Sequence, residues 1–327
     1  MLSADDIALA HAVVIPVLGI QTRFTTNAPA VLEIVEQCFG AWHALAANDV
    51  DADADRVVEV RVAVVSDHAD QRDTTGAAIT HEMSDDLRFV ARSAGGAAES
   101  DPANRIATIV ATRALVADRE RFRAEMLEAA VLALLSCYDR HPLHAAAVAH
   151  RGHALLLAAP SGTGKSTLAY ACHEAGLDLL GDDHVRVQLA PSLRVWGWPG
   201  RVRLLAEAAA QLGVAGEPVK LANGKLKSVV EARCAVTADR LVANDVTLCV
   251  LTRDGDSVSI DPLAPDALAR ALEAQLAPGF DRFPARWPRV VRALTERGGW
   301  RLNLSRDARD AVPVVRNLLA HASRHSS

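Results

Sequence analysis

The sequence contains few lysines, few aromatic residues and no long hydrophobic run. Lysine and arginine together number 35, of which only four are lysine, and aromatic residues make up 4% of the 327 residues. The formal net charge of -5 lacks the basic excess of nucleic-acid-binding surfaces, so we expect no nucleic-acid partner. The apolar runs are too short to span a bilayer, and the acidic start differs from a signal peptide. We therefore expect no membrane partner and a cytoplasmic location.

The five cysteines are scattered along the chain and form no Cys-x-x-Cys pair. This absence excludes the common zinc and redox patterns, and we expect reduced thiols in the core. Hydrophobic residues, in contrast, make up 50% of the chain and charged residues 23%, which is typical of a globular protein. The length is sufficient for two domains, each with its own core.

The pattern of apolar residues changes near residue 140, which predicts two domains. Residues 1–140 mix strand-like and helical runs, with a strand expected over 13–26 and a helix over 28–45. From residue 141 onward short strands, turns and helices alternate, which favours an α/β fold. We expect a smaller mixed α/β N-terminal domain over 1–140, interpreted as a candidate for substrate recognition, followed by a catalytic domain over 141–327.

Within the second domain the apolar runs predict strands over 143–150, 154–159 and 177–180. A helix is expected over 165–175, because Gly176 follows it as a C-terminal cap. The run 245–262 is expected to form a β-hairpin that turns near Gly255.

The segment from Ala159 to Ser166 has the spacing of a P-loop, with Ala159 in place of the usual first glycine. Its glycines allow consecutive N–H groups to face phosphates, and the N-terminus of the following helix favours the same anion. Lys165 is then expected to reach the β- and γ-phosphates of ATP, and Ser166 to bind Mg²⁺. The predicted nucleotide-binding residues are Ser161, Gly162, Thr163, Gly164, Lys165, Ser166 and Thr167.

Two adjacent carboxylates, Asp182 and Asp183, follow the strand predicted over 177–180. Ligands of open α/β sheets bind beyond the carboxyl ends of the strands, so these side chains are expected beside the phosphates. One carboxylate can hold Mg²⁺, and the other can take the proton of an attacking hydroxyl.

Together these segments resemble the HPr kinase/phosphorylase family, bacterial P-loop enzymes that phosphorylate a protein serine. The similar residues are His144-Ala145, a turn at Gly152, Pro160 to Ser166, Ala175-Gly176-Leu177 and Asp182-Asp183. The resemblance implies a P-loop kinase domain of HPr-kinase type, ATP with Mg²⁺, and a homo-oligomer. It also implies that Asp182 is the catalytic base, that Asp183 joins Ser166 at the metal, and that His144 and Lys165 complete the catalytic residues.

The expected function is therefore an ATP-dependent kinase that transfers the γ-phosphate to a hydroxyl acceptor, a Ser or Thr of a peptide or protein. Two alternatives stay open: a small-molecule alcohol kinase of the same fold, and a nucleotide-binding regulatory protein. Residues 161–167 and 180–184 also resemble ATP-dependent phosphoenolpyruvate carboxykinase, which is the last alternative.

The remaining three lysines, Lys220, Lys225 and Lys227, lie within eight residues around a predicted turn at Asn223-Gly224. Lysine is a compact charge on a flexible stem, which suits contact with a moving phosphate or an acidic acceptor. We interpret this cluster as a substrate or phosphate loop.

Overall fold

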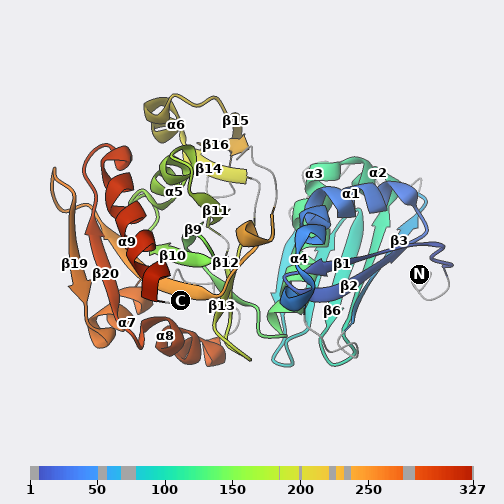
Figure 1. Ribbon diagram of the computed structural model, residues 1–327. Coiled ribbons are helices and arrows are strands. Elements are labelled where there is room, and N and C mark those ends of the chain that lie inside the picture. The colour runs from blue at the N-terminus through green and yellow to red at the C-terminus, as the bar shows by residue number, and fades with distance from the viewer. Residues whose placement is uncertain are drawn as a thin grey trace. The chain divides into compact units, whose positions relative to one another are not determined.

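The computed structural model describes residues 7–50, 57–67, 79–183, 185–198, 201–220, 226–231, 237–274 and 284–325. The chain forms two compact units, Met1–Arg140 and His141–Ser327. Both units are mixed α/β (Figure 1). No helix among the described residues has the length and apolar character needed to cross a membrane.

The N-terminal unit is built on a seven-stranded sheet with the order β1-β2-β3-β7-β6-β5-β4. Its strands are β1 (His11–Val17), β2 (Ile20–Thr26), β3 (Val58–Val65), β4 (Thr80–Met83), β5 (Phe89–Ser93), β6 (Gly96–Asp101) and β7 (Ile106–Thr112). β2, β3 and β7 are mutually parallel, and the other neighbours are antiparallel. The helices are α1 (Pro29–Phe39), α2 (Arg113–Ala117), α3 (Arg119–Arg121) and α4 (Glu128–Ser136), with a π-helical turn over Phe122–Leu127 before α4.

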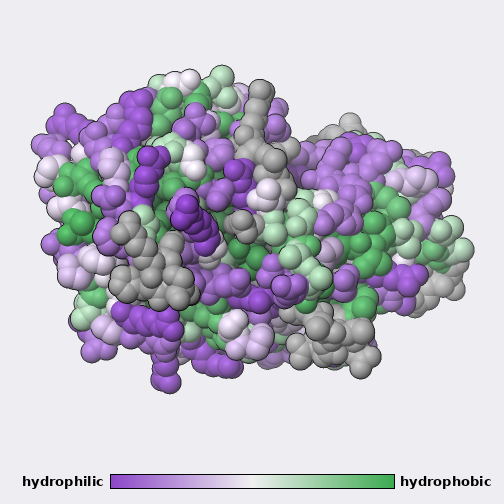
Figure 2. All heavy atoms as spheres, viewed as in Figure 1, coloured by the Kyte–Doolittle hydropathy of each residue, from purple (hydrophilic) through white to green (hydrophobic). Residues whose placement is uncertain are grey.

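Helices α1 and α4 cover the same face of this sheet. Phe24 and Ser100 belong to one row of paired residues that crosses β2, β3, β7 and β6. Phe24 stacks on Phe39 of α1, and the Ser100 hydroxyl donates a hydrogen bond to the Ala130 carbonyl of α4. The opposite face carries exposed and half-exposed side chains. In the view of Figure 2 the surface of this unit mixes hydrophobic and hydrophilic residues.

The second unit is built around a six-stranded sheet with the order β11-β9-β10-β18-β20-β19. Its strands are β9 (Ala146–His150), β10 (His153–Ala158), β11 (Asp178–Gly181), β18 (Asp245–Thr252), β19 (Ser259–Leu263) and β20 (Gly299–Asn303). β10, β18 and β20 run parallel at its centre. β9 is antiparallel to both β10 and β11, so β10 and β11 point in the same direction.

Helices cover both faces of the six-stranded sheet. Leu155 and Leu157 of β10 pack in the core cluster of α5 (Lys165–Glu174) and α9 (Val312–His325). Leu156 points the other way and packs with α7 (Pro265–Glu273) and α8 (Trp287–Thr295). Strand side chains alternate between faces, so a strand buried on both sides reads as a continuous apolar run.

Two smaller antiparallel sheets complete this unit. The first has the order β17-β13-β12-β8 and contains β8 (His141–Leu143), β12 (Val185–Gln188), β13 (Arg194–Trp196) and β17 (Val242–Ala243). The second, which we call the outer sheet, contains β14 (Arg201–Leu205), β15 (Glu217–Lys220) and β16 (Leu226–Glu231) in the order β14-β16-β15. Helix α6 (Ala206–Leu212) follows β14 and packs on the outer sheet.

Three predicted elements differ from the structure. The strand expected over 13–26 is a hairpin that turns at Leu18 and Gly19, both with positive φ. The strand expected over 143–150 breaks at His144, because β8 and β9 belong to different sheets. The hairpin expected over 245–262 is wrong: β20, from a distant part of the sequence, lies between β18 and β19.

Candidate active site

Five segments meet at one edge of the six-stranded sheet. β10, β11 and β18 all end there, and the antiparallel β9 begins there, since Ala147 pairs with Gly181 and Ala146 with Leu157. Four of the segments at this edge directly follow the strands β10, β11, β18 and β20. The fifth is His144, just before β9.

Residues 159–164 connect β10 to α5 in the conformation that the glycines permit. Gly162 has φ +94° and Gly164 has φ +118°, values that side-chain-bearing residues rarely adopt. Gly164 is also the N-cap of α5, and no side chain caps the first N–H groups of the helix. The first turn of α5 therefore offers unsatisfied N–H donors and the positive end of the helix dipole to an anion.

Lys165 is the first residue of α5 and is 4% exposed. Its ammonium donates hydrogen bonds to the carbonyls of Ala159, at 2.7 Å, and Pro160, at 3.5 Å. Burial lowers the pKa of Lys165, while the nearby charges of Asp183 and Asp182 raise it. The lysine thus lies folded against its own loop, next to the two carboxylates.

Asp182 directly follows β11 and is 7% exposed. One carboxylate oxygen, Oδ2, accepts a hydrogen bond of 2.9 Å from the backbone N–H of Arg203 in β14. Burial and the charge of Asp183 raise the pKa of Asp182, and a hydrogen bond from the Ser166 hydroxyl lowers it. The other oxygen, Oδ1, is buried and has no hydrogen-bond partner among the described residues.

Asp183 has a positive φ of 61° and lies beside two cationic or titratable side chains. Its Oδ2 accepts a hydrogen bond of 3.2 Å from Lys227, and its Oδ1 is 3.9 Å from His144 Nδ1. Burial would raise the pKa of Asp183, but the positive charge of Lys227 holds it below its usual range. Burial and the charge of Lys165 lower the pKa of His144, although the charge of Asp183 opposes this shift.

The structure thus brings His144, Lys165, Ser166, Asp182 and Asp183 together at one edge of the sheet. Ser161 and Gly162 are exposed, Thr163 and Gly164 are half-exposed, and Thr167 lies in the first turn of α5. Of the lysine cluster, Lys227 reaches Asp183, Lys220 ends β15, and Lys225 lies outside the described residues, as does the turn predicted at Asn223-Gly224.

Two residues at this edge were not identified from the sequence. Arg203 supplies the N–H that holds Asp182, and Arg253 follows β18. A Cβ atom added to Gly164 would lie 3.1 Å from Arg253 Nη2, so the guanidinium rests against the loop of residues 159–164. Arg253 could have been found from its place directly after an apolar strand, had β18 been recognised as the parallel neighbour of β10.

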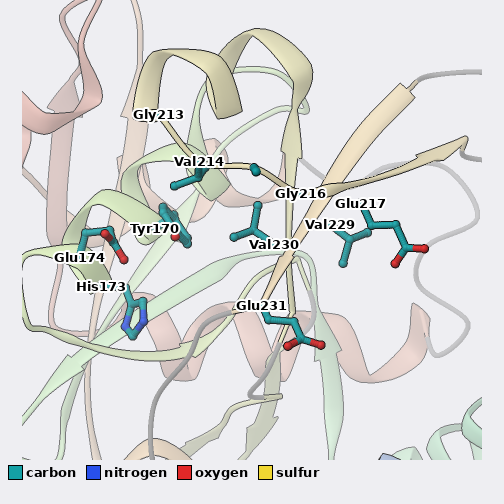
Figure 3. Close-up of a pocket in the computed structure, with 11 residues that line it drawn as sticks. Tyr170, His173, Glu174, Gly213, Val214, Gly216, Glu217, Val229, Val230 and Glu231 are labelled. Atoms are coloured by element: carbon teal, nitrogen blue, oxygen red, sulfur yellow. The ribbon is translucent and has the colours of Figure 1, made fainter.

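A cavity of about 640 Å³ lies elsewhere on α5 and contains none of the predicted site residues. Figure 3 shows Tyr170, His173 and Glu174 of α5 on one side, and Gly216, Glu217 and Glu231 on the other. The carboxylates of Glu174, Glu217 and Glu231 point in different directions and do not converge on one point (Figure 3). The cavity therefore has no assembled cation site.

Comparison with known proteins places few constraints on this chain. No protein-family model matches it, and no curated protein matches it. Among solved structures, it is similar to the Hpr(Ser) kinase/phosphatase from Coxiella burnetii, at 10% identity and a TM-score of 0.29, over 57% of this chain and 98% of that one. A TM-score this low supports no conclusion about fold or activity, so the function has to be argued from the geometry of the site.

Proposed function

We propose that this protein is an ATP-dependent kinase that transfers the γ-phosphate to a hydroxyl group, a Ser or Thr of a peptide or protein. The observation that carries the proposal is the convergence of an uncapped, glycine-led helix N-terminus with Lys165 and two carboxylates at one sheet edge. An uncapped helix N-terminus that follows a glycine-containing loop binds polyphosphate. A nucleotide-binding protein without catalysis needs Lys165 and one carboxylate for the phosphates and their metal ion, but it has no use for a second carboxylate.

The residues present fit a magnesium ion at Asp182. Its Oδ1 is buried without a hydrogen-bond partner among the described residues, and the Ser166 hydroxyl lies beside the same carboxylate and lowers its pKa. Magnesium in nucleotide enzymes is held by one or two protein oxygens together with substrate phosphates and water, so these two groups suffice. When bound, the ion would neutralise charge on the β- and γ-phosphates.

This geometry favours a reversal of the two carboxylate roles that the family resemblance implied. Asp182 is the carboxylate next to Ser166, which suits the metal. Asp183 is next to His144 and Lys227 and its side chain is 16% exposed, so an acceptor hydroxyl can reach it. We therefore assign Asp183 as the group that orients the hydroxyl and accepts its proton, with Lys227 holding the carboxylate in place and His144 beside it.

The proposed reaction is a single in-line transfer. The acceptor oxygen attacks the γ-phosphorus, the bond from that phosphorus to the β,γ-bridging oxygen breaks, and ADP leaves. The hydroxyl proton passes to Asp183. Lys165 turns from the carbonyl of Ala159 to the phosphates, and Arg253, which has no hydrogen-bond or ion-pair partner among the residues the structure describes, contacts the transferring group.

Carboxamide variants of the two aspartates test this proposal. Binding of Mg-ATP is measured by calorimetry, and phosphate transfer from γ-labelled ATP is measured on a pool of serine- and threonine-containing peptides. We expect Asp183→Asn to bind Mg-ATP as the unaltered protein does and to lose transfer by about a thousandfold or more, because proton abstraction and hydroxyl positioning are both removed.

Asp182→Asn is expected to differ by requiring a higher Mg²⁺ concentration for both binding and transfer. Full transfer by Asp183→Asn, with loss only in Asp182→Asn, would restore the assignment implied by the family resemblance. A full-length protein that binds no Mg-ATP would refute the kinase proposal altogether.

A further inference from the structure

The outer sheet carries an unusual share of exposed apolar side chains. Among the described residues, the large hydrophobic side chains that are exposed number five, and three of them belong to this sheet. They are Leu205 at 40%, Val219 at 37% and Leu226 at 56%. Exposed apolar residues gathered on one small sheet indicate an interaction surface more often than scattered ones do.

The strand register places two of these side chains beside the candidate base. Leu205 of β14 and Val219 of β15 both pair with Lys227 of β16, so the three side chains form one row across the sheet. Lys227 is the residue that donates to Asp183 Oδ2. Directly paired residues have Cβ atoms about 5 Å apart, so Leu205 and Val219 lie on either side of the lysine that holds Asp183.

A second row on the same face carries charge. Arg203 and Glu217 both pair with Val229, two residues along β16 from Lys227. The side chain of Arg203 is exposed and has no hydrogen-bond or ion-pair partner among the described residues, although its backbone N–H holds Asp182. On the other face of the sheet Val202, Leu204 and Val230 pack in the cluster that contains α5, and the exposed Leu226 lies on that face at the start of β16.

We propose that this face of the outer sheet docks the polypeptide that carries the acceptor hydroxyl, with apolar side chains next to the Ser or Thr and an acidic side chain facing Arg203. The inference rests on the proposed kinase function. Lys227, which donates to Asp183, belongs to the row of Leu205, Lys227 and Val219, so a hydroxyl that approaches Asp183 along this face brings its flanking groups against the two apolar side chains. Arg203 supplies the charge that a complementary acidic residue would meet.

This surface fits a polypeptide better than a small alcohol. The exposed row is open and apolar, whereas sites for small polar molecules are concave and enclose the ligand. Successive rows on one face of a strand lie about 7 Å apart, which matches residues i and i+2 of an extended peptide laid along β16. An apolar residue beside the acceptor and an acidic residue two positions away is the pattern that the two rows predict.

The test is a positional peptide library. Peptides with one central Ser or Thr, in which each flanking position is fixed in turn to each amino acid, are incubated with the full-length protein and γ-labelled ATP. The unaltered protein is expected to prefer Leu, Val, Ile or Phe beside the acceptor and Asp or Glu near it. The double variant Leu205→Ser/Val219→Ser should lose the apolar preference and raise the KM of the best peptide about tenfold at similar kcat, since roughly 1.4 kcal/mol of apolar contact is removed.

Charge reversal provides the sharper result. Arg203→Glu is expected to convert the acidic preference into a preference for Lys or Arg, because its backbone N–H to Asp182 is retained while its side-chain charge is inverted. Arg289→Glu is the matched control, since Arg289 is exposed on α8, on the opposite face of the six-stranded sheet from α5, and reversing its charge should leave every preference unchanged. Urea unfolding of each variant verifies that the fold is intact.

Three outcomes would overturn the docking surface. The first is an unchanged preference in both the double variant and Arg203→Glu. The second is a protein that binds Mg-ATP but labels no peptide, including one that labels only small alcohols such as glycerol. The third is a dimer in sedimentation that dissociates in the double variant, which would assign the face to a second copy of the chain. A protein that binds no Mg-ATP would instead refute the kinase proposal.

Discussion

In each unit parallel strands end at a common edge of the sheet, but the polar residues at the two edges have different roles. In the N-terminal unit these residues satisfy backbone groups. Asn27 after β2 bonds both the N–H and the carbonyl of Val64, at 2.8 and 2.9 Å. Asp67 after β3 accepts from the Ala114 N–H, and Thr112 of β7 caps α2. The polar groups at this edge are therefore occupied in maintaining the fold.

In the second unit the groups at the corresponding strand ends include hydrogen-bond donors and acceptors that have no partner among the described residues. α5 begins without a side-chain cap, whereas α2 has one. Asp182 Oδ1 is buried without a partner, and Arg253 has none among the residues that the structure describes. The comparison teaches that parallel strands alone do not make a site. A site also needs unsatisfied hydrogen-bond donors and acceptors at the strand ends, because a ligand can then satisfy them.

Among the variants that test this comparison of the two units, the largest expected effect is that of Arg253 on turnover. Arg253→Ala should lower kcat about a hundredfold or more, since a cation that contacts the transferring phosphoryl group stabilises charge only in the transition state. The Kd of Mg-ATP should change little. Labelled-phosphate transfer under saturating ATP measures the loss.

The matched control is Arg113→Ala in the N-terminal unit. Arg113 is exposed and directly follows β7 as Arg253 follows β18. It should leave kcat unchanged. Equal losses in the two variants would show that position after a parallel strand, rather than contact with Gly164, explains the effect.

Lys165→Ala is expected to weaken Mg-ATP binding by about fiftyfold to a hundredfold, the value of removing one charge-assisted contact to phosphate. Isothermal calorimetry on the full-length protein measures the change. Lys227→Ala is the companion variant. Because Lys227 donates a hydrogen bond to Asp183, this variant should retain ATP binding and lose phosphate transfer instead. Normal ATP affinity in Lys165→Ala would contradict the P-loop assignment.

Asn27→Ala should produce the opposite kind of defect. It removes both backbone contacts of Asn27 and should lower the free energy of unfolding by about 1–3 kcal/mol, measured by urea titration. Mg-ATP affinity, measured without urea and well below the unfolding temperature, should not change. A loss of ATP affinity without a loss of stability would mean that the edge of the N-terminal unit also binds ligand.

The smallest expected effect concerns acid stability of the second unit. His153 is buried in β10 and its Nε2 is 2.8 Å from the Thr247 hydroxyl. Burial lowers the pKa of His153, so the folded state takes up its proton less readily than the unfolded chain. Stability is therefore expected to fall as the pH drops below about 6.5, the ordinary histidine value, where the unfolded state binds more protons.

Replacing this histidine isolates its contribution. His153→Gln should show a flatter decline of the urea midpoint between pH 7.5 and about 5.5, the range over which an ordinary histidine titrates. Parallel curves for the two proteins would show that another group causes the acid sensitivity.

The site residues that could be predicted from the sequence to be neighbours are those arranged by short-range structure. The glycines, Lys165 and Ser166 are adjacent in the sequence, and a single strand–loop–helix arranges them. Asp182 and Asp183 could be placed because the end of a strand is readable from its apolar run. Expectations about the N-terminal domain as a substrate reader and about oligomerisation stay predictions.

The parts that were missed depend on pairing between distant segments. β18 and β20 pair although dozens of residues separate them, and the pattern of each strand is compatible with a hairpin. β14 and β16 were not recognised as strands, because their exposed face mixes Arg203, Leu205 and Lys227 without clear alternation. Local periodicity cannot decide which strands become neighbours, since that depends on burial in the whole core.

The sequence alone determined the chemistry that is available: a glycine-led loop with Lys165, and two carboxylates after an apolar strand. These follow from backbone sterics and hydrophobic period, which act over a few residues. Only the tertiary structure decided which carboxylate lies next to Ser166, that Lys227 holds Asp183, and that Arg253 rests on Gly164. Those contacts join segments from different strands, and their positions are set by the packing of helices on both faces of one sheet.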